Sequence, residues 1–413
     1  MIYVRLYIDP GTGSMLFAIL IGLLGVARFA FKGLWVKLRF LLSGGKQKNT
    51  DNKALPLVIF ADDKRYWPVF EPVIRELDSR GFDVVYMTAS EDDPGLSENG
   101  LSHFKSEFIG AGNKAFAKLN FLHATILLST TPGLDVYQWK RSKDVRYYVN
   151  MAHSPAEITT YRMFGLDYYD AVITSGQYQV DDIRKLEKMR DLPAKEMPIL
   201  GLPYMDEKKK ALEAAGPLGD HERTVLLAPS WGPSSLLNRF GSSIIDELIA
   251  TGYHIIFRPH PQSFTSEKEM IDDLMKKYPD SNKFEWNRDT DNFDALYRSD
   301  IMLSDFSGVI FDYALVFDKP VICAISEFDN SPYDAWWLDT PTWSSKAIPR
   351  IGKVLNKEDL PNLKKMIDDC IDDSSFAENR RIARNETWCN QGKSAGLVAD
   401  YLISKYEEIN SIS

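Results

Sequence analysis

Residues 254–261, HIIFRPHP, and residues 301–308, IMLSDFSG, decide the fold of this chain. Each stretch begins with a short apolar run that predicts a buried strand, and polar residues follow the run at once. Open sheets of parallel strands bind ligands at the carboxyl ends of the strands, which is where these polar residues would lie. The second stretch then opens a helix, whose free N–H groups suit a phosphate. The pair therefore predicts an α/β fold with a site for an anionic ligand.

The same alternation of strand-like and helix-like segments runs through the rest of the chain. Strands are expected at residues 57–60, 83–86, 125–128, 146–150, 171–174, 198–200, 224–229, 254–257, 283–286, 301–303 and 320–323. Helices are expected at residues 69–79, 206–213, 309–317, 357–373 and 395–408. Short apolar runs separated by helices argue for doubly wound parallel sheets.

The strand pattern pauses at a turn-rich segment, residues 216–222, and then restarts. We therefore expect two Rossmann-like domains, at residues 46–215 and 216–413. Two such domains facing each other form a cleft, and clefts between domains are favoured ligand sites.

The amino terminus differs from this globular pattern because residues 15–27 form an uninterrupted run of low polarity. Six cations follow the run: Arg28, Lys32, Lys37, Arg39, Lys46 and Lys48. We expect residues 1–45 to be a membrane-associated segment, with a spanning or re-entrant helix favoured over an interfacial helix or a buried core helix. Because the cations come after the run, the body of the protein is expected at the cytoplasmic face.

Composition excludes several classes of function. The net charge of −9 gives no general attraction to nucleic acid or another polyanion. The three cysteines are widely spaced and not accompanied by paired histidines, so neither a disulfide framework nor a zinc site is expected, and a reducing compartment fits best. No metal-binding spacing occurs, and the absence of a dinucleotide fingerprint and of a Walker pattern argues against simple dehydrogenases and P-loop enzymes.

Two candidate site residues follow the strand at 254–257. Arg258 offers a planar fork of donors that matches a phosphate, and His260 can donate a hydrogen bond or pass a proton. The prolines on both sides of His260 restrict the backbone and so present both side chains rigidly. The plainer alternative is an arginine paired with a surface carboxylate beside a solvated histidine.

The turn after the strand at 301–303 supplies a second group. Ser304 or Ser307 could cap the helix, Gly308 permits close approach of a ligand, and the helix N–H groups and dipole would stabilise a diphosphate. Asp305 lies in the same turn, and Asp312, one helical turn after Gly308, could face the ligand or solvent. An ordinary N-cap remains the alternative because such caps are frequent.

Other strand ends add three more candidates. Ser230 and Trp231 directly follow the strand at 224–229. Trp231 could stack on a nucleobase or fill a gap in packing. His153 follows the strand at 146–150, where catalytic groups collect, and histidine is the commonest general base. A hydrogen-bonded structural histidine is the alternative for His153.

Taken in order, these motifs resemble the CDP-glycerol glycerophosphotransferase family of teichoic acid synthesis over residues 57 to 390. The resemblance rests on HSP at 153–155, DAVITS at 170–175, GLPYMD at 201–206, LAPSW at 227–231, RPHP at 258–261, and the stretch 304–322. It implies a two-domain GT-B architecture and transfer of an alditol phosphate from a CDP-linked donor to a lipid-linked acceptor hydroxyl. It also implies membrane association and no cofactor or metal.

The resemblance also implies roles for the candidate residues. By it, His153 is the base that deprotonates the attacking hydroxyl, while Arg258, His260 and the turn at 304–307 hold the diphosphate. Charge stabilisation and in-line positioning would then supply most of the rate.

Three positions depart from the family pattern. Ser154 stands where the family usually has glycine, Glu157 lies near a lysine position, and Gly232 replaces a basic residue after the tryptophan. Two alternatives stay open. A GT-B glycosyltransferase or sugar-nucleotide epimerase would share the fold and a diphosphate site. Glu157 in place of a cation leaves open a catalytically weakened protein that binds or assembles a surface polymer.

Overall fold

The computed structural model describes residues 54–289, 291–324 and 329–412. The expected membrane-associated segment, residues 1–45, lies outside the described residues. Among the described helices, none is long and apolar enough to cross a membrane.

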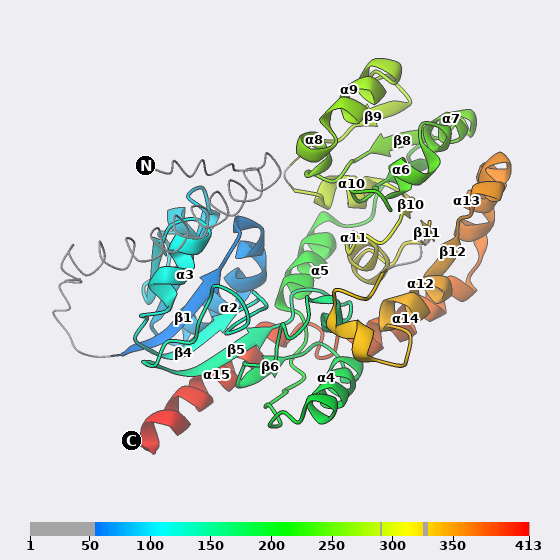
Figure 1. Ribbon diagram of the computed structural model, residues 1–413. Coiled ribbons are helices and arrows are strands. Elements are labelled where there is room, and N and C mark those ends of the chain that lie inside the picture. The colour runs from blue at the N-terminus through cyan, green and yellow to red at the C-terminus, as the bar shows by residue number, and fades with distance from the viewer. Residues whose placement is uncertain (1–53, 290, 325–328, 413) are drawn as a thin grey trace, which may run out of the picture. The chain divides into compact units, whose positions relative to one another are not determined.

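The first sheet consists of six parallel strands in the order β3-β2-β1-β4-β5-β6 (Figure 1). Its strands are β1 (Leu55–Ala61), β2 (Val84–Thr88), β3 (Phe104–Phe108), β4 (Ala124–Ser129), β5 (Val145–Met151) and β6 (Ala171–Ile173). Its helices are α2 (Trp67–Ser79), α3 (Asn113–Leu119), α4 (Gln177–Arg190) and α5 (Pro203–Ala215), with short turns η1 (Lys64–Tyr66), η2 (Pro94–Ser97) and η3 (Ile158–Thr160).

The second sheet also has six parallel strands, in the order β12-β11-β10-β7-β8-β9. Its strands are β7 (Thr224–Leu227), β8 (His254–Phe257), β9 (Phe284–Trp286), β10 (Ile301–Ser304), β11 (Val321–Cys323) and β12 (Gly352–Val354). The helices between its strands are α6 (Leu236–Phe240), α7 (Ser243–Ala250), α8 (Ser263–Ser266), α9 (Lys268–Lys277), α10 (Phe293–Arg298), α11 (Val309–Phe311) and α12 (Trp343–Ile351).

Three helices follow β12 and complete the chain: α13 (Leu363–Asp372), α14 (Ser375–Thr387) and α15 (Ser394–Ser411). The short elements of this half are η4 (Asp312–Val316), a π-helical turn that continues α11, and the 3₁₀ turns η5 (Asp334–Trp337) and η6 (Lys357–Asn362).

The two sheets share one topology. Counted from its own first strand, each sheet has the order 3-2-1-4-5-6, so each reverses direction beside that strand, between β1 and β4 or between β7 and β10. The crevice outside the carboxyl ends of the strands at such a reversal is where doubly wound sheets bind ligands. The prediction of two parallel-sheet α/β domains is confirmed.

Several predicted elements differ in detail. The expected strand at 198–200 contributes only an isolated bridge between Thr174 and Ile199. The two edge strands β3 and β12 were not predicted, because β3 carries alternating exposed polar residues and β12 has three residues and begins with Gly352. Helices α4 and α14 were also missed, since both are polar over most of their length.

The last helix, α15, packs on the first sheet and not on the second. Val398, Ala399 and Leu402 are fully buried in the core formed with β1, β2 and β4, and α15 runs beside that sheet in Figure 1. Burial of a valine or leucine side chain contributes about 1.5–3 kcal/mol. The expected assignment of all of residues 216–413 to the second domain is therefore wrong for α15. We call the first sheet with its helices and α15 the first lobe, and residues 216–393 the second lobe.

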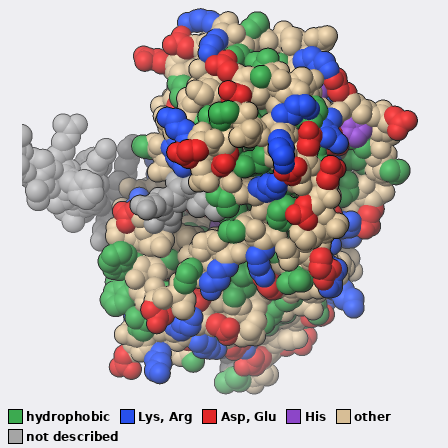
Figure 2. Space-filling view, turned by 90° about the vertical axis from the view of Figure 1, so that its right-hand side faces the viewer, with side chains coloured by type: hydrophobic (Ala, Val, Ile, Leu, Met, Phe, Trp, Pro, Cys, Tyr) green, Lys and Arg blue, Asp and Glu red, His purple; other side chains and the backbone are tan. Residues whose placement is uncertain are grey.

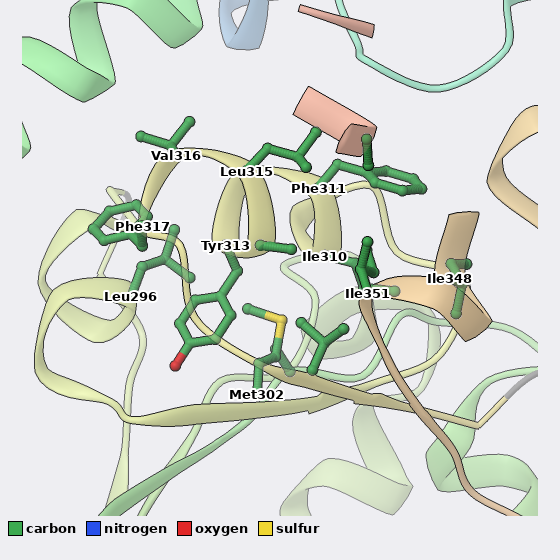
Figure 3. Packing of buried hydrophobic residues seen from close by; sticks show 14 of the residues in the cluster. Leu296, Met302, Ile310, Phe311, Tyr313, Leu315, Val316, Phe317, Ile348 and Ile351 are labelled. Carbon is green, nitrogen blue, oxygen red and sulfur yellow. The ribbon is translucent and has the colours of Figure 1, made fainter. Parts of the chain in front are cut away.

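The helix after β10 is fixed by a deep apolar cluster. Figure 3 shows Ile310 and Tyr313 on this helix pointing toward Met302 of β10, with Phe317 beside Leu296. Each of these five side chains is buried. The turn between β10 and α11 is consequently held between two rigid elements.

A second-lobe segment reaches back to the first lobe near η5. The buried carboxylate of Asp334 accepts hydrogen bonds from the backbone N–H of Phe164 at 2.7 Å and from Arg190 at 2.5 Å. Arg190 also pairs with Asp167 at 2.8 Å. The lobes are thus joined at this point by a buried charge network.

A second buried carboxylate, Asp206, lies at the start of α5 and joins this helix to the segment that leads from α14 into α15. Its oxygens accept hydrogen bonds from Trp388 Nε1 at 2.8 Å, Gly392 N at 2.8 Å and Ser394 N at 3.0 Å. These donors lie where the chain leaves the second lobe and enters α15. Asp206 therefore fixes the crossing that brings α15 onto the first sheet.

We expect Asp206→Asn to lower the midpoint of thermal unfolding, because an amide nitrogen then faces an N–H donor and leaves it unpaired. The free energy of unfolding should fall by about 1–3 kcal/mol. The matched control is Glu207→Gln, which removes only the surface ion pair with Lys210 and should change stability by less than about 0.5 kcal/mol. Equal shifts for the two variants would contradict the role assigned to Asp206.

Candidate active-site cleft

A cleft of about 1160 Å³ lies between the lobes. First-lobe residues that line it include Arg65, Tyr66 and His153, and helices α2 and α5 form much of its wall. From the second lobe it is lined by Arg258, Asn292, Gly308 and Asp312, among others. Four of the predicted site residues, His153, Arg258, Gly308 and Asp312, are thus brought to one cleft from strands of two different sheets.

His153 lies two residues past β5, in an aromatic setting. Its Nδ1 is 3.2 Å from the hydroxyl of Tyr161, and the ring of Tyr66 packs edge-on against it with centroids 4.9 Å apart. Burial lowers the pKa of His153 to about 4, and the nearby charge of Arg65 also lowers it. The imidazole is therefore neutral at pH 7 and able to accept a proton.

Arg258 lines the cleft from the end of β8. Its guanidinium donates to the side-chain oxygen of Asn287, and no Asp or Glu in the described part of the chain lies within ion-pair distance of it. Burial lowers the pKa of Arg258, while the charges of Asp289 and Asp291 raise it, and arginine remains charged under either influence. No ion pair within the described residues therefore occupies its positive charge.

His260 lies with Trp231, at a ring-centroid separation of 6.4 Å, and neither residue lines the cleft. The Nδ1 of His260 accepts a hydrogen bond from the backbone N–H of Gln262 at 3.1 Å, so the neutral ring carries its proton on Nε2. Burial and the charge of Arg65 lower the pKa of His260. The ring is thereby prepared as a neutral hydrogen-bond donor. Trp231 is 46% exposed, so it does not fill a gap in packing.

Ser304 and Asp305 face inward and support the site instead of lining it. Ser304 Oγ donates to the carbonyl of Ala228 at 2.6 Å. The Asp305 carboxylate accepts from Ser230 N at 3.1 Å and from Leu236 N at 2.7 Å. Both side chains are buried and hold the turn after β7 against β10. The prediction that they contact a substrate is therefore corrected to a supporting role.

The turn at the start of α11 also differs from expectation. Gly308 is the N-cap, and no side chain caps the helix, so the predicted caps by Ser304 or Ser307 are wrong. Gly308 is exposed on the cleft, and Ser307 is half-buried beside it. Ser230 Oγ is buried without a hydrogen-bond partner.

Asp312 does line the cleft, but its carboxylate is engaged. It accepts a hydrogen bond from Tyr204 Oη at 3.0 Å and pairs with Lys208 at 2.5 Å, both on α5. Asp312 thus links the helix after β10 to the helix that connects the lobes, and Lys208 neutralises its charge.

Two of the three departures from the family pattern have structural reasons. Glu157 accepts hydrogen bonds from Ser344 N at 3.0 Å and Ser344 Oγ at 2.6 Å, so it caps α12 of the second lobe from the first. Gly232 has a φ of +91°, a conformation in which a basic residue would be strained. Ser154 lines the cleft, and its Oγ accepts from Ala156 N at 3.2 Å.

Sequence reasoning missed Arg65, Tyr66 and Tyr161. Arg65 and Tyr66 follow β1 closely, and the rule that ligands lie at strand ends could have found them. No sequence signal marks Tyr161, because it reaches His153 from η3.

On the face shown in Figure 2, Lys and Arg side chains are interspersed with Asp and Glu. Within residues 54–289, 291–324 and 329–412, no three side chains of His, Cys, Asp or Glu come together as a metal site would require.

Solved structures share this fold at low sequence identity. UDP-GlcNAc 2-epimerase of Methanocaldococcus jannaschii, determined with UDP-GlcNAc and UDP, is 11% identical with a TM-score of 0.55, covering 85% of this chain and 100% of that one. MnaA of S. aureus, determined with UDP, is 11% identical with a TM-score of 0.59, covering 86% and 97%. A putative UDP-N-acetylglucosamine 2-epimerase from Listeria monocytogenes is 13% identical with a TM-score of 0.56, covering 86% and 98%. These likenesses show the two-lobed α/β fold alone.

No curated protein sequence matches the chain. The family model described as CDP-Glycerol:Poly(glycerophosphate) glycerophosphotransferase matches residues 165–404, which is more than half of the chain and includes the motifs around Arg258, Gly308 and Asp312. The resemblance noted from the sequence is thereby confirmed, and this chain belongs to the CDP-glycerol:poly(glycerophosphate) glycerophosphotransferase family.

Proposed function

We propose that this protein transfers glycerol phosphate, or a related alditol phosphate, from a CDP-linked donor to a hydroxyl group of a membrane-linked acceptor. The product would extend or prime a teichoic acid-like surface polymer. One observation carries the proposal: a neutral histidine, His153, and an unpaired arginine, Arg258, line one cleft from opposite lobes. The family to which the chain belongs supports a nucleotide-linked donor.

The proposed chemistry needs a base for the acceptor and positive charge for the donor. His153 takes the proton of the attacking hydroxyl while the oxygen of that hydroxyl bonds to the phosphorus of the alditol phosphate. The bond from that phosphorus to the bridging oxygen breaks, and CMP leaves with the electron pair. Arg258 stabilises negative charge on the transferring group, as the arginine of a phosphoryl-transfer site does.

Neighbouring groups would hold the donor. Gly308 allows the CDP-linked substrate to approach the backbone closely at the start of α11. The Nε2–H of His260 is available to donate a hydrogen bond to that substrate. Ser307 lies in the same turn as Gly308, and Trp231 presents an exposed ring near His260. The carboxylate of Asp312, while paired with Lys208, could accept a hydrogen bond from a hydroxyl group of the CDP-linked substrate. The donor is a substrate, and the proposal includes no further cofactor.

The proposed attachment to a membrane rests on the amino-acid sequence. Residues 15–27 form a low-polarity run followed by six cations, which suits attachment to the cytoplasmic face of a membrane. A lipid-linked acceptor would lie in the same membrane.

A nucleotide-sugar enzyme is the competing function, because two of the structural neighbours named above were determined with UDP or UDP-GlcNAc. We expect CDP-glycerol or CDP-ribitol to raise the thermal unfolding midpoint of the full chain by several degrees, and UDP-GlcNAc to raise it little. Binding to the native state stabilises by about 2.7 kcal/mol at a hundredfold excess over Kd. Stabilisation by UDP-GlcNAc alone would favour the competing function.

Arg258→Gln should raise KM for the CDP-linked donor by about 10-fold to 10²-fold, because a hydrogen bond to a charged group contributes about 1.5–3 kcal/mol. The measurement is initial rate against donor concentration. Arg75→Gln is the matched control, since Arg75 lines the same cleft but is paired with Glu71 and Glu98. A similar KM for Arg258→Gln and the parent protein would remove Arg258 from the donor site.

The acid limb of kcat/KM should lie well below neutral pH. The free base is present above the pKa of His153, about 4, and is lost as the pH falls through that value, so kcat/KM should be level from about pH 6 to 8 if His153 is the base. His153→Ala should lower kcat by about 10²-fold or more. An acid limb centred between pH 6 and 7, or full activity in His153→Ala, would contradict its assignment as base.

A further inference from the structure

The cations that line the cleft differ in whether a carboxylate of the same wall pairs with them. Three of the lysine and arginine side chains in the lining have such a partner: Arg75 with Glu71, Lys208 with Asp312, and Lys210 with Glu207. Arg258 has no carboxylate partner, and Asp63, the partner of Arg65, lies outside the lining. Within the described residues, two arginines from opposite lobes therefore present charge that no carboxylate of the wall pairs with, and the donor site proposed above uses one of them.

The local setting of Arg65 leaves its guanidinium available to a ligand. Arg65 lies in η1, just past the end of β1, where the first sheet reverses its strand order. Asp63 caps this turn by accepting from the backbone N–H of Arg65 at 2.9 Å, and it also accepts from the guanidinium at 3.1 Å. The Arg65 side chain is 67% exposed, and exposed ion pairs contribute little to stability. An anion in the cleft can therefore bind Arg65 without a large loss.

Two measured contacts place Arg65 beside the proposed base. Its guanidinium carbon lies 5.7 Å from the centroid of the Tyr66 ring. That ring packs edge-on against His153, with centroids 4.9 Å apart. The charge of Arg65 also lowers the pKa of His153, after the larger effect of burial. Arg65 is thus a cation of the first lobe on the same side of the cleft as His153.

The chemistry of the transfer limits where the attacked phosphorus can lie relative to His153. A general base acts at about 2.6–3.2 Å from the hydroxyl oxygen whose proton it takes. The attacking oxygen lies about 3–3.5 Å from the atom that it attacks. The attacked phosphorus is therefore within about 7 Å of the accepting nitrogen of His153. A long, exposed arginine beside His153 reaches the oxygens of a phosphoryl group held there.

We propose that Arg65 binds the phosphoryl group that is transferred, so that this group is held by one arginine from each lobe. This inference rests on the proposed function and adds a substrate-binding residue of the first lobe to it. The planar fork of a guanidinium donates two parallel hydrogen bonds to a phosphate. Because CMP is the leaving group, the phosphoryl group that Arg65 binds is absent from CMP and present in CDP-glycerol.

The two ligands CMP and CDP-glycerol therefore test the assignment, with dissociation constants measured by isothermal titration calorimetry on the full chain without acceptor. We expect Arg65→Gln to weaken the binding of CDP-glycerol by about 10-fold to 10²-fold and to change the binding of CMP by less than about twofold. Arg65→Lys keeps the charge but loses the fork, so its affinity for CDP-glycerol should lie between those of the parent protein and Arg65→Gln. Unchanged binding of CDP-glycerol in Arg65→Gln, or an equal loss for both ligands, overturns the proposal.

Lys64→Gln is the matched control. Lys64 is the neighbouring cation of the same turn, pairs with Asp92 on the surface, and does not line the cleft. Its removal should leave both dissociation constants unchanged. A loss of CDP-glycerol binding in Lys64→Gln equal to that in Arg65→Gln would reveal only a long-range effect of charge, which also overturns the proposal.

Turnover and folding complete the test. Arg65→Gln should lower kcat/KM for CDP-glycerol by about 10-fold to 10²-fold, and its unfolding midpoint should equal that of the parent protein because the side chain is exposed. If the parent protein binds no CDP-linked donor, the proposed function fails and this inference fails with it. If the parent protein and Arg65→Gln bind CDP-glycerol equally well, the inference fails alone.

Discussion

The arrangement of the two lobes depends on the buried carboxylate of Asp206. Its three donors lie at the end of α14 and the start of α15, so one side chain joins the connecting helix α5 to the chain that returns to the first sheet. A buried charge is tolerated only when it is fully hydrogen-bonded, and Asp206 meets that condition. Helix α15 then buries its apolar face on the first sheet. This packing sets the spacing of the lobes around the cleft.

Desolvation lowers the pKa of both main site residues but leaves them in different charge states. Burial keeps His153 neutral, with a pKa of about 4, which suits a proton acceptor. Arg258 is also partly desolvated, yet a guanidinium keeps its charge, and its partner is the neutral side chain of Asn287. A low-dielectric cleft strengthens any interaction of that charge with a phosphate. The same cleft therefore holds a neutral base and a charged cation, although both side chains are desolvated.

The positions of most strands were predictable because their signals are local, whereas many of the helices were not predicted. The strand at 254–257 coincides with β8, and the expected helix at 206–213 lies within α5. Edge strands were missed because polar residues on an exposed edge give no apolar run. The roles of Ser304 and Asp305 were misread for another reason: polar residues at a strand end suit a ligand and a neighbouring backbone equally well, and only the path of the turn after β7 shows that these two serve the backbone.

The sequence by itself determined the two parallel α/β sheets, the family, and the strand ends at which Arg258 and His153 lie, because apolar periodicity and short motifs are properties of contiguous residues. The tertiary structure alone decided which of these groups share a cleft, that Glu157 caps a helix of the other lobe, and that Tyr161 touches His153. It also brought α15 back across the molecule to the first sheet. Such contacts join residues far apart in the chain, and they are set by how the lobes pack, which no local pattern encodes.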